Sequence, residues 1–256
     1  FKVNSGEYKL MGLASYGKPI YKDIILKNLI DIKEDGSFRL NQKYFSYSTG
    51  LTMTNKKFDD LFGQPAREKE DELLTQFHMD IASSVQSVTE EIVLRLVKDI
   101  AKEYQIKNLC MAGGVALNCV ANGKILQNKI FDNIWIQPAA GDAGGSLGAA
   151  LAYWHKELDQ KREIKSSDSM KGSYLGPRFE NSIVEKELKS LNANFKEYPE
   201  EQLLNILSTE LSKEKTVGWF QGRMEFGPRA LGARSILADP RSEKMQKELN
   251  LKVKFR

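Results

Sequence analysis

The sequence has little of the two residue types that most often build disulfide and metal sites. Its 256 residues include 2 cysteines and 2 histidines. Cys110 and Cys119 are too few for a disulfide scaffold and do not form the Cys-x-x-Cys pair typical of zinc. Both stand among apolar residues, so we expect buried free thiols in a reducing cytoplasm. His78 and His155 are isolated in the sequence, and we expect structural roles for both.

Long hydrophobic runs and a strong charge of one sign are also missing. No apolar stretch approaches the roughly 18 residues that a membrane span requires, and the first residues carry no signal-peptide core. The chain opens on Phe1 and not on methionine, which favours a piece of a longer protein. The 38 basic and 34 acidic residues leave a net charge of +4 without a basic stripe. The sequence therefore predicts neither a membrane nor a nucleic-acid partner.

The first half of the chain predicts short elements around one long helix. We expect a helix over 7–14, a hairpin over 30–40 and an uninterrupted amphipathic helix from about 69 to 104. Two strand–glycine turn–helix units follow, with strands at 108–112 and 134–137 and helices at 115–127 and 147–158. This alternation predicts an α/β layer that binds ligands at the ends of its strands.

The second half begins with a polar segment, 159–173, which we expect to form a linker because it is poor in apolar anchors. Beyond it, the patterns predict a strand at 216–220 that enters the loop 221–233, and helices at 181–191, 200–213 and 243–249. About 85 residues are few for an independent core, so we expect this second domain to be incomplete.

The first motif that could carry chemistry is Gly113-Gly114, with Asn118 four residues further on. Two glycines after a strand let a ligand approach the backbone, and the start of the following helix favours phosphate. The order of residues matches neither a P-loop nor the dinucleotide fingerprint. A Gly-Gly turn is more often simple punctuation between elements, and that alternative stays open.

The second motif is Asp142, which stands in a glycine-rich strand-to-helix corner. A carboxylate at this position can cap the helix or bind a cation. Gly141, Gly144, Gly145 and Gly148 clear more space than a cap requires, which favours a ligand site. Gly144 and Gly148, four residues apart, are alternatively suited to close helix packing.

The third motif is a loop that carries three arginines and one glutamate, bracketed by glycines and a proline: Arg223, Glu225, Arg229 and Arg234. Arginine forks suit phosphate or carboxylate oxygens, and a stiff loop can hold them convergent. The alternative is a surface loop in which Glu225 pairs with an arginine. We favour a functional loop, because packing alone does not explain why three arginines follow a buried strand so closely.

Taken together, these segments resemble the carbamoyltransferase family of the NodU and CmcH type. The matching stretches, in chain order, are 7–17, 111–118, 141–148, 175–177 and 218–232. The last, GWFQGRMEFGPRALG, is long and highly specific, and the likeness spans nearly the whole chain. The resemblance implies an α/β chain with part of an actin/sugar-kinase-like (ASKHA) ATPase domain at 1–165 and part of a YrdC-like domain at 172–256.

In enzymes of this type, the YrdC-like domain joins carbamoyl phosphate and ATP into carbamoyl-adenylate and releases pyrophosphate. The ATPase-like domain then passes the carbamoyl group to an acceptor hydroxyl, with a bound iron or similar divalent metal. The resemblance thus implies a cytoplasmic O-carbamoyltransferase whose acceptor is a hydroxylated small molecule, such as a sugar or natural product. The acceptor, the metal and the oligomeric state, a homodimer included, stay open.

The resemblance also assigns residues. Asp142 matches the aspartate ligand of the metal, and the cofactor-binding set comprises Gly113, Gly114, Asn118, Gly141 and Gly144. Arg229 falls where the YrdC-like domain grips phosphate, and the catalytic set that it heads comprises Arg229, Arg223, Arg234 and Glu225.

One departure from the family pattern concerns the metal. The family's paired metal histidines have no counterpart here, because neither His78 nor His155 stands in a His-x-x-x-His pattern. We therefore expect this chain alone to be inactive, with one metal ligand and a half-built phosphate site. A sugar-kinase-like phosphotransferase and a non-catalytic nucleotide-binding module stay open as alternatives, although a kinase would not require the arginine loop.

Overall fold

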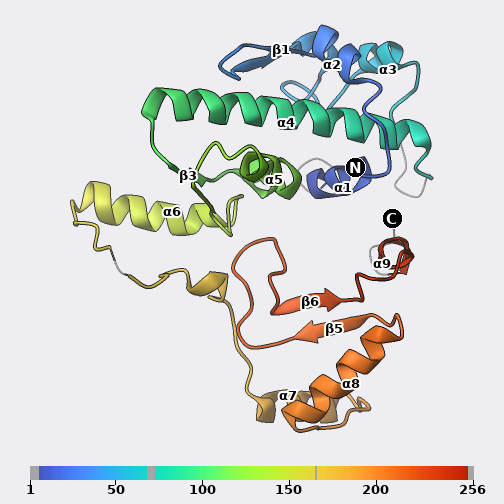
Figure 1. The fold of residues 1–256 in the computed structure, drawn as a ribbon, viewed down its shortest axis with the longest axis vertical. Helices are drawn as coiled ribbons and strands as arrows, with labels where there is room; N and C mark the ends of the chain where they lie inside the picture. The colour runs from blue at the N-terminus through green and yellow to red at the C-terminus, as the bar shows by residue number, and fades with distance from the viewer. Residues whose placement is uncertain (1–5, 68–72, 165, 253–256) are drawn as a thin grey trace. The chain divides into compact units, whose positions relative to one another are not determined.

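The computed structural model describes residues 6–67, 73–164 and 166–252 (Figure 1). The contacts divide the chain into two units, Phe1–Gln137 and Pro138–Arg256. The domains predicted at 1–165 and 172–256 are parts of an ASKHA-like and a YrdC-like domain. The two units do not test this assignment, which stays a prediction. Within the described ranges, no helix combines the length and the apolar character needed to cross a membrane.

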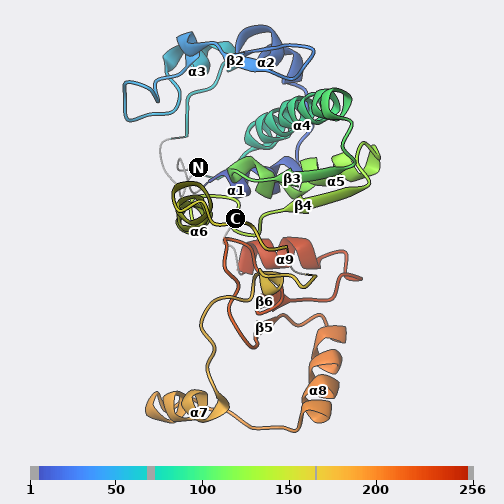
Figure 2. The ribbon, with the colours of Figure 1, turned by 90° about the vertical axis from the view of Figure 1, so that its left-hand side faces the viewer.

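The first unit is organised by the long helix α4 (Gln76–Tyr104). Helices α1 (Glu7–Ala14), α2 (Lys22–Asn28) and α5 (Cys119–Gln127) all contact it. The elements β1 and α2 lie on one side of α4, and β3 and α5 lie on the other (Figures 1 and 2). The predicted helices at 7–14 and along α4 are confirmed, whereas α2 and α3 (Lys56–Phe62) were not predicted.

Helix α4 begins later than its apolar pattern predicts. Thr75 caps it, and the His78 ring Nδ1 accepts a hydrogen bond from the Thr75 N–H at 3.0 Å, which completes a capping box. Leu73 lies before the helix and is 88% exposed, so the predicted continuation through Leu73 is wrong. The predicted start at 69 lies outside the described residues. His78 has the structural role that its isolation predicts.

Two apolar clusters hold the first unit together, one on each side of α4 (Figure 1). One is formed by Ile25, Leu29, Ile30 and Val88 under the hairpin of β1 (Ile30–Ile32) and β2 (Phe38–Leu40). The other joins α4 to α5 and comprises Val93, Val97, Ala121, Ile125 and Phe131. The hairpin is antiparallel, as predicted.

Strands β3 (Asn108–Met111) and β4 (Asn133–Ile136) pair in parallel, with α5 as the connection between them. Parallel pairing through a helical connection confirms the predicted α/β class for this part of the chain. The helix predicted over 115–127 is divided in two: a 3₁₀ turn covers Gly114–Leu117, and α5 begins at Cys119. Asn118 lies at the break.

Both cysteines are free, as predicted, but both are exposed, so the prediction of burial is wrong. Successive residues of a strand face opposite sides of the sheet. Leu109 and Met111 face the core, whereas Cys110 faces the uncovered side with Trp135, which is 47% exposed. Cys119 lies at the start of α5 and outside the face that the helix buries.

The second unit contains four helices among its described residues: α6 (Gly144–Ala152), α7 (Asn181–Ser190), α8 (Glu200–Ser212) and α9 (Met245–Lys252). The predicted helices at 181–191 and 200–213 are confirmed, and α6 continues into a π-helical turn over Tyr153–Glu157. Strands β5 (Val217–Phe220) and β6 (Arg234–Leu237) form an antiparallel pair. The sequence predicts β5 but not β6.

The end of the predicted linker is part of the folded second unit. Ser173 is completely buried, with its Oγ donating to the Phe226 carbonyl at 3.0 Å. The Phe226 N–H donates in return to the Ser173 carbonyl at 2.7 Å. A serine can be buried without penalty when its polar groups are paired. The linker was predicted from its lack of apolar residues, and this criterion missed the buried Ser173.

The core between α4 and α5 gives a first prediction. Ile125 is 0% exposed, whereas the next residue, Leu126, is 58% exposed. We expect Ile125→Ala to lower the free energy of unfolding of the first unit by about 2–5 kcal/mol, because it leaves a cavity. Leu126→Ala, the control, should cost less than about 1 kcal/mol in urea titrations followed by circular dichroism. Equal losses would mean that this core does not form.

Candidate functional site

The arginine loop between β5 and β6 closes around one buried carboxylate. Glu225 is 6% exposed, and its Oε1 accepts hydrogen bonds from the backbone N–H groups of Leu231, Ala233 and Arg234 at 2.7, 2.8 and 3.3 Å. One side chain thus fixes the backbone on the far side of the loop. These partners are backbone amides, and the Arg223 and Arg234 guanidiniums donate to backbone carbonyls and not to this carboxylate.

The environment of Glu225 contains two opposing influences. Burial raises the pKa of the carboxyl, and the hydrogen bonds from the N–H groups of Leu231, Glu225 itself, Ala233 and Arg234 lower it. The hydrogen bonds outweigh burial, and the pKa falls from 4.5 to about 2. Glu225 is therefore ionised at neutral pH.

Arg234 and Arg223 both donate to backbone carbonyls. The Arg234 guanidinium lies 3.4 Å from the centre of the Phe220 ring and donates to the carbonyls of Gln221 and Gly222 at 2.9 and 3.2 Å. Arg223 donates to the Gly176 carbonyl at 3.1 Å. Arg229 lies in the same loop and is partly exposed. Their predicted roles in phosphate binding stay predictions.

The Leu175-Gly176-Pro177 segment is joined to the same loop. The Gly176 N–H donates to the Met224 carbonyl at 2.8 Å, and the Met224 N–H donates to the Pro177 carbonyl at 3.0 Å. A Cβ on Gly176 would lie 2.8 Å from the Met224 oxygen, so only glycine fits there. Two of the stretches that carry the family resemblance are thus paired in space.

The arginine loop also packs against the turn that leads to Asp142. Gly227 has a φ of +136°, and a Cβ there would lie 2.4 Å from the Pro138 carbonyl oxygen. Only glycine permits this approach. Ala139 and Ala140, on the other side of that contact, are buried. The second and third motifs of the sequence are therefore neighbours within the second unit.

Asp142 itself is exposed, in the turn immediately before α6. Ala143 occupies the N-cap position without a side-chain cap, so the capping alternative is excluded. Gly144 packs closely, because a Cβ there would lie 2.0 Å from the Ala139 oxygen, whereas Gly145 and Gly148 have open space around them. This excludes close helix packing as the reason for Gly148 within the described part of the chain.

The Asp142 carboxylate can supply one metal ligand. Among the residues that the structure describes, no three His, Cys, Asp or Glu side chains come together as a metal site. The chain therefore fits a divalent metal only as a partial donor, with further ligands from outside these residues. Asp142 as a ligand stays a prediction.

The Gly113-Gly114 corner presents open backbone in the first unit. Gly113 has a φ of +94°, and a Cβ on either glycine would meet nothing within 4 Å. This open space fits the predicted approach of a ligand to the backbone. Asn118 instead makes structural contacts: its Oδ1 accepts from the Ala121 N–H at 3.1 Å, and its Nδ2 donates to Gln86 at 2.9 Å.

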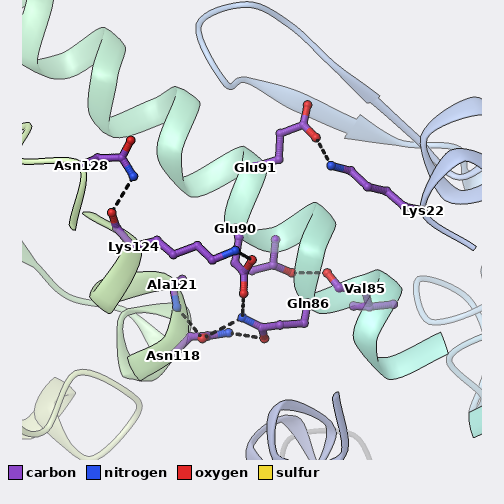
Figure 3. A network of polar contacts seen from close by, with 10 residues as sticks. Lys22, Val85, Gln86, Glu90, Glu91, Asn118, Ala121, Lys124 and Asn128 are labelled. Carbon is purple, nitrogen blue, oxygen red and sulfur yellow. Dashed lines mark hydrogen bonds and ion pairs between the residues drawn. The ribbon is translucent and has the colours of Figure 1, made fainter. Parts of the chain in front are cut away.

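The partners of Asn118 belong to a buried polar network that the sequence did not predict (Figure 3). The Gln86 side chain also donates to the Glu90 carboxylate at 2.9 Å, and Glu90 forms an ion pair with Lys124 of α5. Gln86 and Glu90 are each 7% exposed. Gln86 and Glu90 are four residues apart on α4, so they lie on the same face of the helix. This spacing could have indicated the network, but the prediction followed apolar residues alone.

The chain is thus an α/β protein. In its second unit, the arginine loop contacts both the Leu175-Gly176-Pro177 segment and the turn that leads to Asp142. It belongs to the carbamoyltransferase family, as the resemblance predicts. The family model described as the carbamoyltransferase N-terminus matches residues 1–151, and the model described as the carbamoyltransferase C-terminus matches residues 208–256.

Three relatives illustrate the similarity. The chain is 60% identical, over 100% of its length, to an uncharacterized protein of Synechocystis sp.. It is 34% identical to the nodulation protein NolO of Bradyrhizobium diazoefficiens and 36% identical to the nodulation protein NolNO of Sinorhizobium fredii, each over 98% of its length. The chain spans 42%, 43% and 35% of these relatives.

The Glu225 carboxylate gives a second prediction. Because its pKa is lowered to about 2 in the folded chain, from 4.5, its contribution to stability is complete above pH 4.5 and is lost as the pH falls toward 2. Glu225→Gln cannot titrate, so its unfolding free energy should vary less over this range. At neutral pH it should cost about 1–3 kcal/mol, because backbone amides lose their charged acceptor.

The measurement is a set of urea titrations between pH 2 and 7, followed by tryptophan fluorescence. Glu197→Gln removes an equivalent charge from an exposed position of the same unit and serves as the control. The control should follow the unchanged protein at every pH. A pH profile of Glu225→Gln that also matched it would disprove the role of this carboxylate in closing the loop.

Proposed function

We propose that this chain is part of an ATP-dependent O-carbamoyltransferase. In the proposed reaction, carbamoyl phosphate, ATP and water give carbamoyl-adenylate, pyrophosphate and inorganic phosphate. The carbamoyl group then passes to a hydroxyl of a sugar or natural product, and AMP is released together with the hydroxyl proton. The proposal rests on the family to which the chain belongs and on the geometry of its motif segments. It includes the ASKHA-like and YrdC-like domains that the resemblance implies.

One observation carries the proposal: the arginine loop and the Asp142 turn pack against each other in the second unit. Their contact is made where Gly227 approaches Pro138. A loop that offers guanidinium groups and a turn that offers a carboxylate suit two different parts of an activated acyl donor. Guanidiniums bind its phosphate oxygens, and a carboxylate can hold a cation close to its carbonyl oxygen.

Within the loop, the contacts support a division of labour. Arg229 is the residue that we assign to phosphate. Glu225 acts as a positioning residue, because its hydrogen bonds to Leu231 and Ala233 fix the backbone that follows Arg229. Arg223 and Arg234 hold neighbouring carbonyls and keep their positive charge beside the same loop.

We assign Asp142 to the divalent metal and the Gly113-Gly114 corner to the nucleotide. A bound divalent metal supplies Lewis-acid polarisation of an oxygen atom. Asp142 contributes an exposed carboxylate that no helix cap consumes. Gly113 and Gly114 contribute backbone that a bound group can reach, and Asn118 fixes the end of that corner by capping α5.

A third prediction separates the two half-reactions in the parent protein, expressed at the full length of its gene. Asp142→Asn should reduce metal occupancy and carbamoyl transfer while pyrophosphate release continues. Arg229→Ala should reduce pyrophosphate release first, by about tenfold or more, because a charge-assisted contact to phosphate is lost. Pyrophosphate release, metal content and mass-spectrometric detection of carbamoylated acceptors measure the three effects.

The controls are Asp159→Asn and Arg162→Ala, which make the same changes at exposed positions of the polar segment. Both should leave the two half-reactions unchanged. Loss of the same step in Asp142→Asn and Arg229→Ala would contradict the division of labour. Nucleotide binding without any dependence on carbamoyl phosphate would favour a non-catalytic module, and phosphate transfer to a sugar would favour a kinase.

A further inference from the structure

A hollow of about 340 Å³ in the first unit is lined by residues of α2, α4 and α5. Its lining is charged, with one large apolar side chain: Lys22, Ser87, Glu90, Glu91, Leu94, Arg95, Lys98 and Lys124. A volume of this size is at the lower end for a small-molecule site. The charged side chains of this lining favour a charged ligand.

The charges of the lining do not cancel. Glu91 is shared by two cations, Lys22 at 2.8 Å and Arg95 at 2.5 Å. Glu90 is neutralised by Lys124. Lys98, which lies one turn beyond Leu94, adds a further positive charge. Two positive charges are left over, one from the Glu91 cluster and one from Lys98, so the hollow attracts anions and repels metal cations.

Three cations of the hollow, Lys22, Arg95 and Lys124, are held in place by paired groups. Glu90 is 93% removed from solvent, since 7% of its surface is exposed, and it also accepts from Gln86. Arg95 donates to the Lys33 carbonyl at 3.0 Å in addition to its pair with Glu91. Figure 3 shows Lys22 and Lys124 reaching Glu91 and Glu90 from different elements. Side chains that are fixed before binding lose less entropy when a ligand arrives.

We infer that this hollow binds the phosphate group of a small phosphorylated metabolite. Phosphate oxygens accept several charge-assisted hydrogen bonds at once, which lysine and arginine supply. The Ser87 hydroxyl is a further donor within the lining. This site is distinct from the proposed carbamoyl chemistry and does not depend on it.

The hollow is also connected to the Gly113-Gly114 corner. Lys124 faces the hollow and pairs with Glu90, Glu90 accepts from Gln86, and Gln86 pairs with Asn118. A phosphate in the hollow competes with Glu90 for Lys124, and the change reaches the residue that caps α5. Occupancy of the hollow is therefore expected to be sensed at Asn118.

The experiment uses this 256-residue chain with two probes, inorganic phosphate and glycerol 3-phosphate, in calorimetric titrations at physiological salt. Lys98→Glu reverses the one cation of the hollow whose side chain neither Glu90 nor Glu91 engages. Lys57→Glu makes the same change on exposed α3 and is the control. We expect Lys98→Glu to weaken binding at least tenfold and Lys57→Glu to weaken it less than twofold, because screening limits distant charges.

Amide NMR shifts locate the binding and give an independent readout. Phosphate should shift the signals of Ser87, Lys98, Lys124 and Asn118 before any others. If Lys98→Glu does not fold, Lys98→Gln replaces it, and its folding is checked by circular dichroism. The inference is overturned by an absence of binding at millimolar phosphate, by equal weakening in the two lysine variants, or by shifts outside the hollow. These results leave the carbamoyl-transfer assay of the parent protein unaffected, so the two proposals fail separately.

Discussion

The candidate site of the second unit depends on the burial of one ionised carboxylate. Glu225 loses solvation in the loop, and this cost is offset because three backbone N–H groups converge on its Oε1. Without the carboxylate, these amides would have no common acceptor, and the end of the loop at Leu231–Arg234 would lose its anchor. Arg229 and the contact at Gly227 lie in the loop between Glu225 and this anchor.

Much of the fold could be predicted from the sequence because its helices and strands carry regular apolar patterns. The hairpin, α4, β3, β4, α7 and α8 were predicted for this reason. The short helix α2 was not predicted, and neither was β6, which begins with the polar residues Arg234 and Ser235 at the end of the arginine loop. Cys110 was placed wrongly because burial on β3 depends on what covers each face, and an apolar neighbourhood in the sequence does not specify the face.

The candidate site was predicted in its residue types but not in its contacts. The glycines of the sequence identified the corners at Gly113, Asp142 and Gly227. Positive φ angles at Gly113 and Gly227, and the close approach of Gly144 beside Asp142, require glycine there. The partner of a polar side chain cannot be read from spacing alone. The amide partners of Glu225 were not predicted, and the Gln86–Glu90–Lys124 network joins residues more than 30 positions apart.

The two buried glutamates, Glu90 and Glu225, differ in whether their partners are charged or neutral. Glu90 takes its charge balance from Lys124, so neither charge of that pair is available to a ligand until they separate. Glu225 is stabilised by neutral amides, and Arg223 and Arg234 are held by neutral carbonyls. Dipolar partners fix the position of a charge without cancelling it, whereas an opposite charge cancels it. The carbonyl partners of Arg223 and Arg234 therefore leave the charge of these two guanidiniums uncompensated, as the proposed binding of phosphate requires.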